Sequence, residues 1–354
     1  QNKNQIEDRD TDISNYPDYW EILDFLTDHE RELFFINNSF LEKYIRPLAN
    51  QAWEDATTPR ELFKLYGSHW KTHFPFEQRQ VQKADLTGGT LSPVLTGLIA
   101  MDQQRVDTSL HVAWGVSIGL CLQTIEMFGS DEQKEKWLKP LYYGDKIGCW
   151  ALTEPDNSSD ISLGMRTTAK RSGDTWILNG EKKWIGNGEF ADVTIVMAKD
   201  VDDNQVKAFI VETKTAGYHG EKLWGKIGAR GVENALVTLK NCKVHESNRL
   251  PLVYSFKHIS GFIAGVRQGI GWGATGTALG CYEKTLAYVK KRIQFGKPIG
   301  SYQLIQKNLV EMCGLVCAMQ SMCLRMSLKE KAGKRISHGQ SSLVKAFCTQ
   351  KTRE

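Results

Sequence analysis

The sequence predicts a multidomain α and β protein, with an N-terminal α-helical domain (residues 1–147), a middle β barrel or sandwich (148–252) and an incomplete C-terminal four-helix bundle (253–354). Two observations predict this order. Apolar residues recur at helical spacing in the first and last parts, whereas they alternate at strand spacing in the middle part. Glycine and proline are sparse in the first part, while Gly, Asn and Asp bound the short apolar runs of the middle part.

Two helix starts mark the first domain. Thr58-Pro59-Arg60-Glu61 has the form of a helix N-terminus, with Thr58 as the capping residue and Pro59 at the first helical position. Ser130-Asp131-Glu132-Gln133 opens another helix, which is expected to stop at Pro140. These signals predict an all-α domain.

The middle domain shows short runs with a period of two. The runs Thr175–Leu178, Val193–Met197 and Val206–Val211 read as strands, and their regular spacing favours a compact sandwich or barrel. Asn179-Gly180 is expected to form a hairpin turn, because both residues tolerate positive φ.

The last domain is helical again. Helices are expected over 260–292 and 302–333 and after Ser337, separated by a break at Gly296–Pro298. The stretch Gly271–Gly276 formally satisfies GxGxxG, but no strand precedes it. It therefore predicts a ridge of small residues for close helix packing rather than a nicotinamide site.

Composition excludes several classes of protein. At 354 residues the chain is long enough for more than one core. With 41% hydrophobic and 24% charged residues it is ordinary globular protein. No stretch is expected to approach the roughly 18 uncharged apolar residues that a membrane span needs, so no membrane span is expected. The net charge of +4 is spread along the chain, so nucleic-acid binding has no support.

The cysteines predict a reducing compartment and no metal. Eight are scattered along the chain without a CxxC pair, and a chain of this size needs no disulfides. The pairs Cys313/Cys317 and His69/His73 have helical spacing, but further ligands are missing nearby. The start at Gln1 is polar, which a removed transit sequence or a shortened chain would each explain.

Three motifs in order carry a family resemblance: Cys149–Asp160 (CWALTEPDNSSD), Trp184–Asn187 (WIGN) and Arg292–Gly296 (RIQFG). Together they resemble the acyl-CoA dehydrogenase and acyl-CoA oxidase family. The match is closest to the glutaryl-CoA dehydrogenase-like and short-chain acyl-CoA oxidase branch, and it is weaker before Cys149. The resemblance implies a helix–sheet–helix fold, FAD as cofactor and α,β-oxidation of a short-chain acyl-CoA thioester.

The resemblance also implies site residues. Trp184 would pack against the flavin ring, and Gly186 stands where threonine is usual. Ser159 would meet flavin phosphate or CoA, while Arg267 would brace CoA or flavin. The remaining cofactor contacts fall at Trp150, Leu152 and Thr153 for the flavin ring, and at Arg292, Gln294, Phe295 and Gln303 for the ADP half on a neighbouring subunit of a homodimer or homotetramer.

The chain departs from the family where specificity and proton transfer are decided. His111 stands where the glutaryl-CoA branch places an arginine over the distal carboxylate, and Ser158 replaces a glycine. Some branches carry the catalytic glutamate one residue before Arg267, but this chain has Val266. The glycine-rich turn and glutamate of the other branch are absent as well, and a longer chain is expected to supply them. The catalytic base is therefore unknown.

These departures keep an alternative open, namely a catalytically inactive structural subunit of a larger assembly. For an active enzyme, either an electron-transfer flavoprotein or oxygen would accept the electrons. The family resemblance places the protein in the mitochondrial matrix, with the peroxisome as the alternative.

Overall fold

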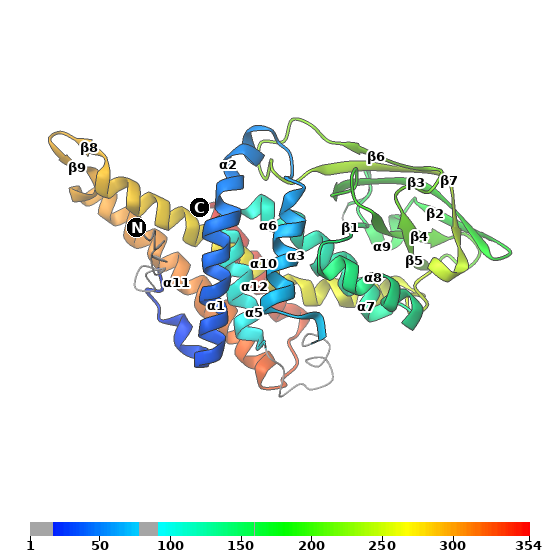
Figure 1. Cartoon of the computed structure of the whole chain (residues 1–354), viewed down its shortest axis with the longest axis horizontal. Coiled ribbons are helices and arrows are strands. Elements are labelled where there is room, and N and C mark those ends of the chain that lie inside the picture. Colours follow the sequence, from blue (N-terminus) through cyan, green and yellow to red (C-terminus); the bar gives the residue numbers. More distant parts are fainter. Residues whose placement is uncertain (1–16, 78–90, 159) are drawn as a thin grey trace, which may run out of the picture. The chain divides into compact units, whose positions relative to one another are not determined.

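The computed structural model describes residues 17–77, 91–158 and 160–354 (Figure 1). The chain forms two compact units. The helical unit consists of Gln1–Lys43, Leu86–Val106 and Gln268–Glu354, and the sheet-containing unit consists of Tyr44–Asp85 and Asp107–Arg267. Along the chain the described elements run from helices through a sheet back to helices, which confirms the predicted fold class.

The helical unit is built from long helices and a small hairpin. Its elements are α1 (Asp28–Phe40), α5 (Pro93–Val106), the part of α10 (Phe256–Lys291) from Gln268 onward, β8 (Ile293–Gln294), β9 (Lys297–Pro298), α11 (Gln303–Lys331) and α12 (His338–Arg353). The glycines at 271–276 lie within α10, and a Cβ at Gly276 would collide with the carbonyl of Met101 in α5. The predicted ridge for close helix packing is confirmed.

The sheet-containing unit combines helices with one sheet of seven strands. Its helices are α2 (Arg46–Glu54), α3 (Glu61–His73), α6 (Thr108–Gly115), α7 (Gln123–Phe128), α8 (Asp131–Tyr142), α9 (Ile161–Gly164) and the beginning of α10. Its strands are β1 (Gly148–Ala151), β2 (Thr168–Ser172), β3 (Thr175–Gly186), β4 (Val193–Asp200), β5 (Val206–Glu212), β6 (Tyr218–Lys222) and β7 (Asn234–His245).

Strand β4 lies between two apolar layers of this unit. The order of strands is β1-β4-β2-β3-β7-β6, with β5 also paired to β4. Ile195 packs in one buried cluster with Leu138 and Leu141 of α8, while Val196 packs in the other with Trp176 of β3. Because alternate residues of a strand point to opposite faces, β4 is buried on both sides. Strand β4 pairs with β1 along Gly148–Ala151, which carries the predicted flavin contact Trp150.

Three local predictions were wrong. Asn179-Gly180 forms no hairpin turn: it lies inside β3 at a register irregularity, where Gly180 uses its freedom to adopt φ 144°. Thr58 does not cap α3, which begins at Glu61, because its hydroxyl donates to the carbonyl of Gly231 instead. Helix α8 continues past Pro140 to Tyr142.

Two helical segments, Thr108–Phe128 and Gln303–Lys331, are long and apolar enough to cross a membrane by length and composition. The expectation that no stretch has this character was therefore wrong. Half of the apolar window in the first segment and 39% of that in the second are buried inside the protein. Buried core helices pass the same test, so these segments are weak evidence for a membrane span.

Candidate functional site

Trp184 is presented by a β-bulge near the end of β3. The register passes from Lys182↔Val237 to Ile185↔Ala235, so two residues of β3 oppose a single residue of β7. Trp184 has a φ of 66°, a left-handed conformation that is rare for a residue with a side chain. Its side chain is 56% exposed. Bulges next to active sites re-aim side chains, and this bulge turns an indole ring toward the surface.

Thr153 lies beside this bulge. The backbone N–H of Lys183 donates to the carbonyl of Thr153 at 2.8 Å, which joins the segment after β1 to β3. Among the described residues the half-buried hydroxyl of Thr153 makes no hydrogen bond. The hydroxyl is therefore available to a ligand bound at this segment, one backbone hydrogen bond away from the residue that precedes Trp184.

A buried ion pair supports the Leu152–Glu154 segment. The ammonium of Lys182 donates to the carbonyl of Leu152 at 3.0 Å and to Glu154 Oε1 at 2.9 Å, and both charged side chains are almost completely buried. Burial lowers the pKa of Lys182 to about 8. Burial also opposes ionisation of Glu154, but Lys182 and the backbone N–H groups of Arg166 and Thr167 outweigh it and lower the pKa of Glu154. Both groups are therefore charged at pH 7.

Asn187 ties three elements together at the end of β3. Its side-chain amide donates to the carbonyl of Ala113 in α6 at 2.8 Å and to that of Gly148 in β1 at 3.2 Å. The helix that carries His111, the strand that carries Trp150 and the Trp184 bulge consequently meet at one buried residue. A Cβ at Gly186 would lie 3.2 Å from Val116, so a larger residue would crowd the segment that follows α6.

Trp150 is half-buried in β1. Its indole N–H donates to the hydroxyl of Thr124 at 3.0 Å, and its ring lies 6.1 Å from that of Phe262 in α10. A hydrogen bond and an aromatic contact thus hold the side chain. Leu152 is buried and follows the strand directly. The structure therefore brings Trp150, Leu152, Thr153, Trp184 and Gly186 into one connected part of the sheet-containing unit.

His111 and Arg267 lie on separate helices of this unit, α6 and α10. The Nδ1 atom of His111 is buried and has no hydrogen-bond partner among the described residues. Burial lowers the pKa of His111 to about 4, so the ring is neutral at pH 7. Val266 packs against an apolar cluster and offers no group that could accept a proton.

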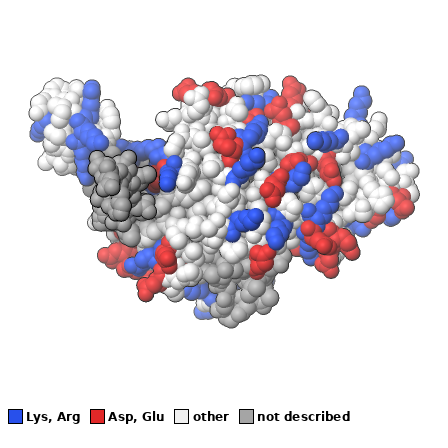
Figure 2. Space-filling model, in the orientation of Figure 1, with Lys and Arg blue, Asp and Glu red and all other residues white. Residues whose placement is uncertain are grey.

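The other predicted contacts lie in the helical unit, on the β8–β9 hairpin and at the start of α11. Arg292, Gln294, Phe295 and Gln303 are all exposed, and the exposed fraction of Phe295 reaches 93%. Figure 2 shows Lys and Arg side chains gathered at this hairpin, where the sequence has Lys290, Lys291, Arg292 and Lys297. Ser159 lies outside the described residues.

Sequence reasoning missed the residues that support the site, namely Glu154, Lys182, Glu233 and Asn234. Lys182 gave a usable signal, since it occupies a buried position of β3 where an apolar residue is usual. Glu233 and Asn234 gave none, because Glu233 meets Thr58 and Asn234 meets Trp184 through contacts distant in sequence.

Three models of acyl-CoA dehydrogenase domains match consecutive parts of the chain: the N-terminal domain over residues 27–145, the middle domain over 149–242 and the C-terminal domain over 256–354. The short-chain-specific acyl-CoA dehydrogenase of Megasphaera elsdenii is 30% identical over 318 residues, which cover 88% of this chain and 82% of that protein. The human mitochondrial short-chain-specific acyl-CoA dehydrogenase is 32% identical over 278 residues, or 77% of this chain and 66% of the human protein.

A solved structure shows the same fold. Glutaryl-CoA dehydrogenase from Mycobacterium smegmatis, determined in complex with FADH2, has a TM-score of 0.83 and 31% identity, and the match covers 95% of this chain and 83% of that one. These similarities confirm the predicted assignment to the FAD-dependent oxidoreductases. The chain belongs to the acyl-CoA dehydrogenase family.

Proposed function

We propose that the protein oxidises a short-chain acyl-CoA thioester between its α and β carbons, with FAD as the hydride acceptor. The observation that carries this proposal is the backbone hydrogen bond from Lys183 to Thr153, which joins the strand of the exposed Trp184 to a threonine whose hydroxyl makes no hydrogen bond among the described residues. The M. elsdenii and human relatives, both named as short-chain specific, support the short acyl chain.

The residues present fit a flavin ring. Trp184 offers an open aromatic face, Thr153 offers a hydroxyl donor, and Trp150 with Leu152 supplies apolar surface. Gly186 has no side chain, so a donor at that position would have to be its backbone N–H. Bound FAD would take the hydride from the β carbon of the substrate. An aromatic ring at Trp184 would exclude water from one side of that path.

The exposed cationic hairpin suits the phosphate half of the cofactor. The guanidinium of Arg292 can donate two hydrogen bonds to one phosphate, and the Phe295 ring can stack on adenine. Because all four residues of this set are exposed, the proposal assigns them to the FAD of a neighbouring copy in a homodimer or homotetramer. Electron-transfer flavoprotein or oxygen would then reoxidise the flavin.

Proton removal sets a further requirement. The α-proton must pass to a group within hydrogen-bond reach of it, and a carboxylate is the usual acceptor. Val266 cannot take this role, so the proposal places the base at another position. The same valine, with Gly186 and His111, favours the second candidate function, an inactive structural subunit built on the same fold.

His111 supports a substrate without a distal charge. Since its ring is neutral at pH 7, it cannot attract a carboxylate at the far end of the acyl chain by charge. We expect His111→Arg to raise kcat/KM for glutaryl-CoA relative to butyryl-CoA by about 10-fold to 150-fold, because a charge-assisted hydrogen bond contributes about 1.5–3 kcal/mol. Steady-state assays of both thioesters measure the ratio, with His111→Gln as the neutral control. An unchanged ratio in His111→Arg would place this residue outside the acyl pocket.

Retention of FAD and its reduction by substrate together separate the two candidate functions. The purified protein is expected to hold FAD, seen as a flavin absorbance spectrum, and butyryl-CoA is expected to bleach it without oxygen. Protein that binds no FAD would favour the structural subunit. The mitochondrial human relative supports the mitochondrial matrix as the compartment, although the M. elsdenii relative is bacterial.

A further inference from the structure

The bulge at Trp184 needs external support. A left-handed conformation costs a non-glycine residue about 1–3 kcal/mol, and it persists only where surrounding contacts hold it. Asn187, three residues later, also has a left-handed φ of 65°. The segment Trp184–Asn187 is therefore bounded by two unfavourable backbone conformations.

Glu233, directly before β7, and Asn234, the first residue of β7, hold both ends of this segment. The side-chain amide of Asn234 donates to the carbonyl of Trp184 at 3.1 Å. The backbone carbonyl of Glu233 accepts from the N–H of Asn187 at 2.9 Å. Asn234 lies opposite Gly186 in the register of β3 and β7, so it faces the middle of the segment.

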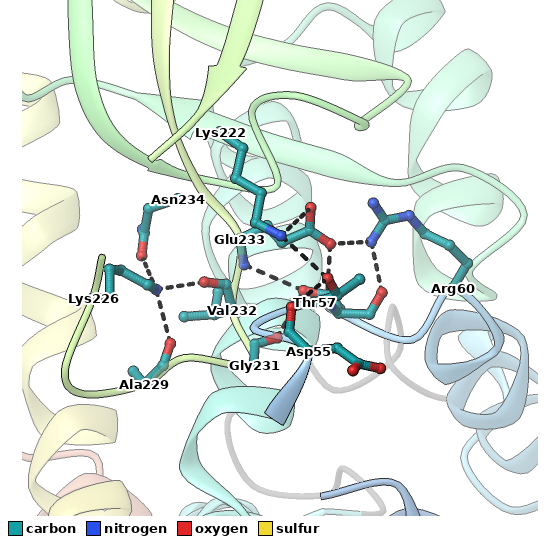
Figure 3. A network of polar contacts seen from close by, with 11 residues as sticks. Asp55, Thr57, Arg60, Lys222, Lys226, Ala229, Gly231, Val232, Glu233 and Asn234 are labelled. Carbon is teal, nitrogen blue, oxygen red and sulfur yellow. Dashed lines mark hydrogen bonds and ion pairs between the residues drawn. The ribbon is translucent and has the colours of Figure 1, made fainter. Parts of the chain in front are cut away.

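Lys226 fixes the orientation of the Asn234 amide. Its ammonium donates to Asn234 Oδ1 at 2.6 Å and to the carbonyls of Ala229 and Val232 at 2.8 and 2.5 Å (Figure 3). A cation at Oδ1 requires that the amide oxygen faces Lys226 and that the N–H₂ group faces Trp184. The lysine thus selects the one orientation in which Asn234 can donate to the bulge.

Glu233 anchors this support to the rest of the unit. Its carboxylate is 4% exposed, and it accepts from the backbone N–H of Thr58 at 2.9 Å and from Arg60 Nη1 at 2.7 Å. The ammonium of Lys222 lies 3.7 Å away. Figure 3 shows the side chains of Arg60 and Lys222 reaching Glu233 from separate segments of the chain. The start of β7 is consequently a rigid base for the Trp184 bulge.

We propose that Asn234, oriented by Lys226, is a positioning residue that holds the Trp184 ring in place for the flavin. This inference rests on the proposed function, since it assumes that Trp184 packs against FAD. Asn234 itself would touch neither cofactor nor substrate. It acts through the backbone of Trp184.

Asn234→Asp removes the N–H donor to Trp184 but keeps the contact with Lys226. Aspartate offers an oxygen to the Lys226 ammonium, so the segment between Lys226 and Asn234 remains held, but it has no N–H to donate to the Trp184 carbonyl. We expect FAD to bind about threefold to tenfold more weakly to the apoprotein of this variant, because one net hydrogen bond is lost. Bound flavin should also fluoresce more strongly, since a displaced indole quenches it less. Both are measured by titrating apoprotein with FAD.

Two further variants complete the test. Asn234→Ala should weaken FAD binding at least as much, while Lys243→Ala, an exposed change in the same strand, should leave both readouts at wild-type values. If Asn234→Asp and Asn234→Ala bind FAD with wild-type affinity and fluorescence, the positioning role is wrong although the enzyme remains a flavoprotein. If the wild-type protein binds no FAD, the proposed function itself fails.

Discussion

Replacing Lys182 by methionine is expected to lower the free energy of unfolding by about 3–5 kcal/mol, because the change leaves the Glu154 carboxylate buried without its counter-charge. Methionine fills a similar volume, so the loss comes from the charge and not from a cavity. The thermal unfolding transition should fall by about 6 °C or more for a unit of this size. Differential scanning calorimetry measures the shift.

An exposed ion pair of the same length provides the control. Lys146 lies 2.9 Å from Asp192, the same separation as in the buried pair, but both partners are partly exposed. Lys146→Met should therefore cost less than about 1 kcal/mol. Equal shifts for the two variants would show that burial of the Lys182 pair does not determine its contribution.

The second large loss of stability is expected on substitution of Arg105 in the helical unit. Its guanidinium is 2% exposed and contacts Asp102 and Glu42 at 2.6 Å and Glu283 at 2.8 Å. Asn38 donates to the fully buried Asp102 as well. Arg105→Met removes the positive charge shared by three carboxylates and should cost about 3–5 kcal/mol at pH 7.

The stability that Arg105→Met loses should depend on pH, and the loss should be smaller at acidic pH. Burial already raises the pKa of Asp102, and Arg105 is the largest influence that opposes this rise. Without Arg105 the pKa of Asp102 in the folded protein rises further above its value in the unfolded chain. The folded state is then destabilised by ionised Asp102 but not by protonated Asp102. The deficit in Arg105→Met should therefore shrink as the pH falls from 7 to 5.

Thermal unfolding of both proteins at the two pH values measures this change. Adding Asp102→Asn to Arg105→Met should remove most of the pH dependence, because the buried carboxylate is then absent. A deficit that grows on acidification would contradict the assignment of the effect to Asp102.

The sequence predicted the order of helices and strands because the local spacing of apolar residues indicates which segments are helices and which are strands. The strands near Thr175, Val193 and Val206 and the long helices after Phe256 appear where their apolar spacing places them. Turn chemistry was less reliable. Asn179-Gly180 has the composition of a hairpin turn, but β3 pairs with β7 across it and absorbs Gly180 in an irregularity.

The residues of the candidate site could be predicted only where they lie in a sequence motif of the family. Trp184 and Thr153 were predicted in this way, and a backbone hydrogen bond from Lys183 to Thr153 joins their two segments, while their role as flavin contacts stays a prediction. Their supports were not found, because Thr58 reads as a helix cap in sequence while its hydroxyl and N–H bind the segment around Glu233. Contacts between positions about 175 residues apart leave no local pattern.

Anaerobic mixing of the FAD-loaded protein with butyryl-CoA tests whether the protein oxidises acyl-CoA. We expect the flavin absorbance to bleach on mixing and unsaturated acyl-CoA to form in equal amount, and we expect Trp184→Ala to lose FAD and hence the signal. If the protein keeps fully oxidised FAD in the presence of butyryl-CoA and its longer and branched homologues, the proposed activity is wrong and the chain is a scaffold that retains the fold without the chemistry.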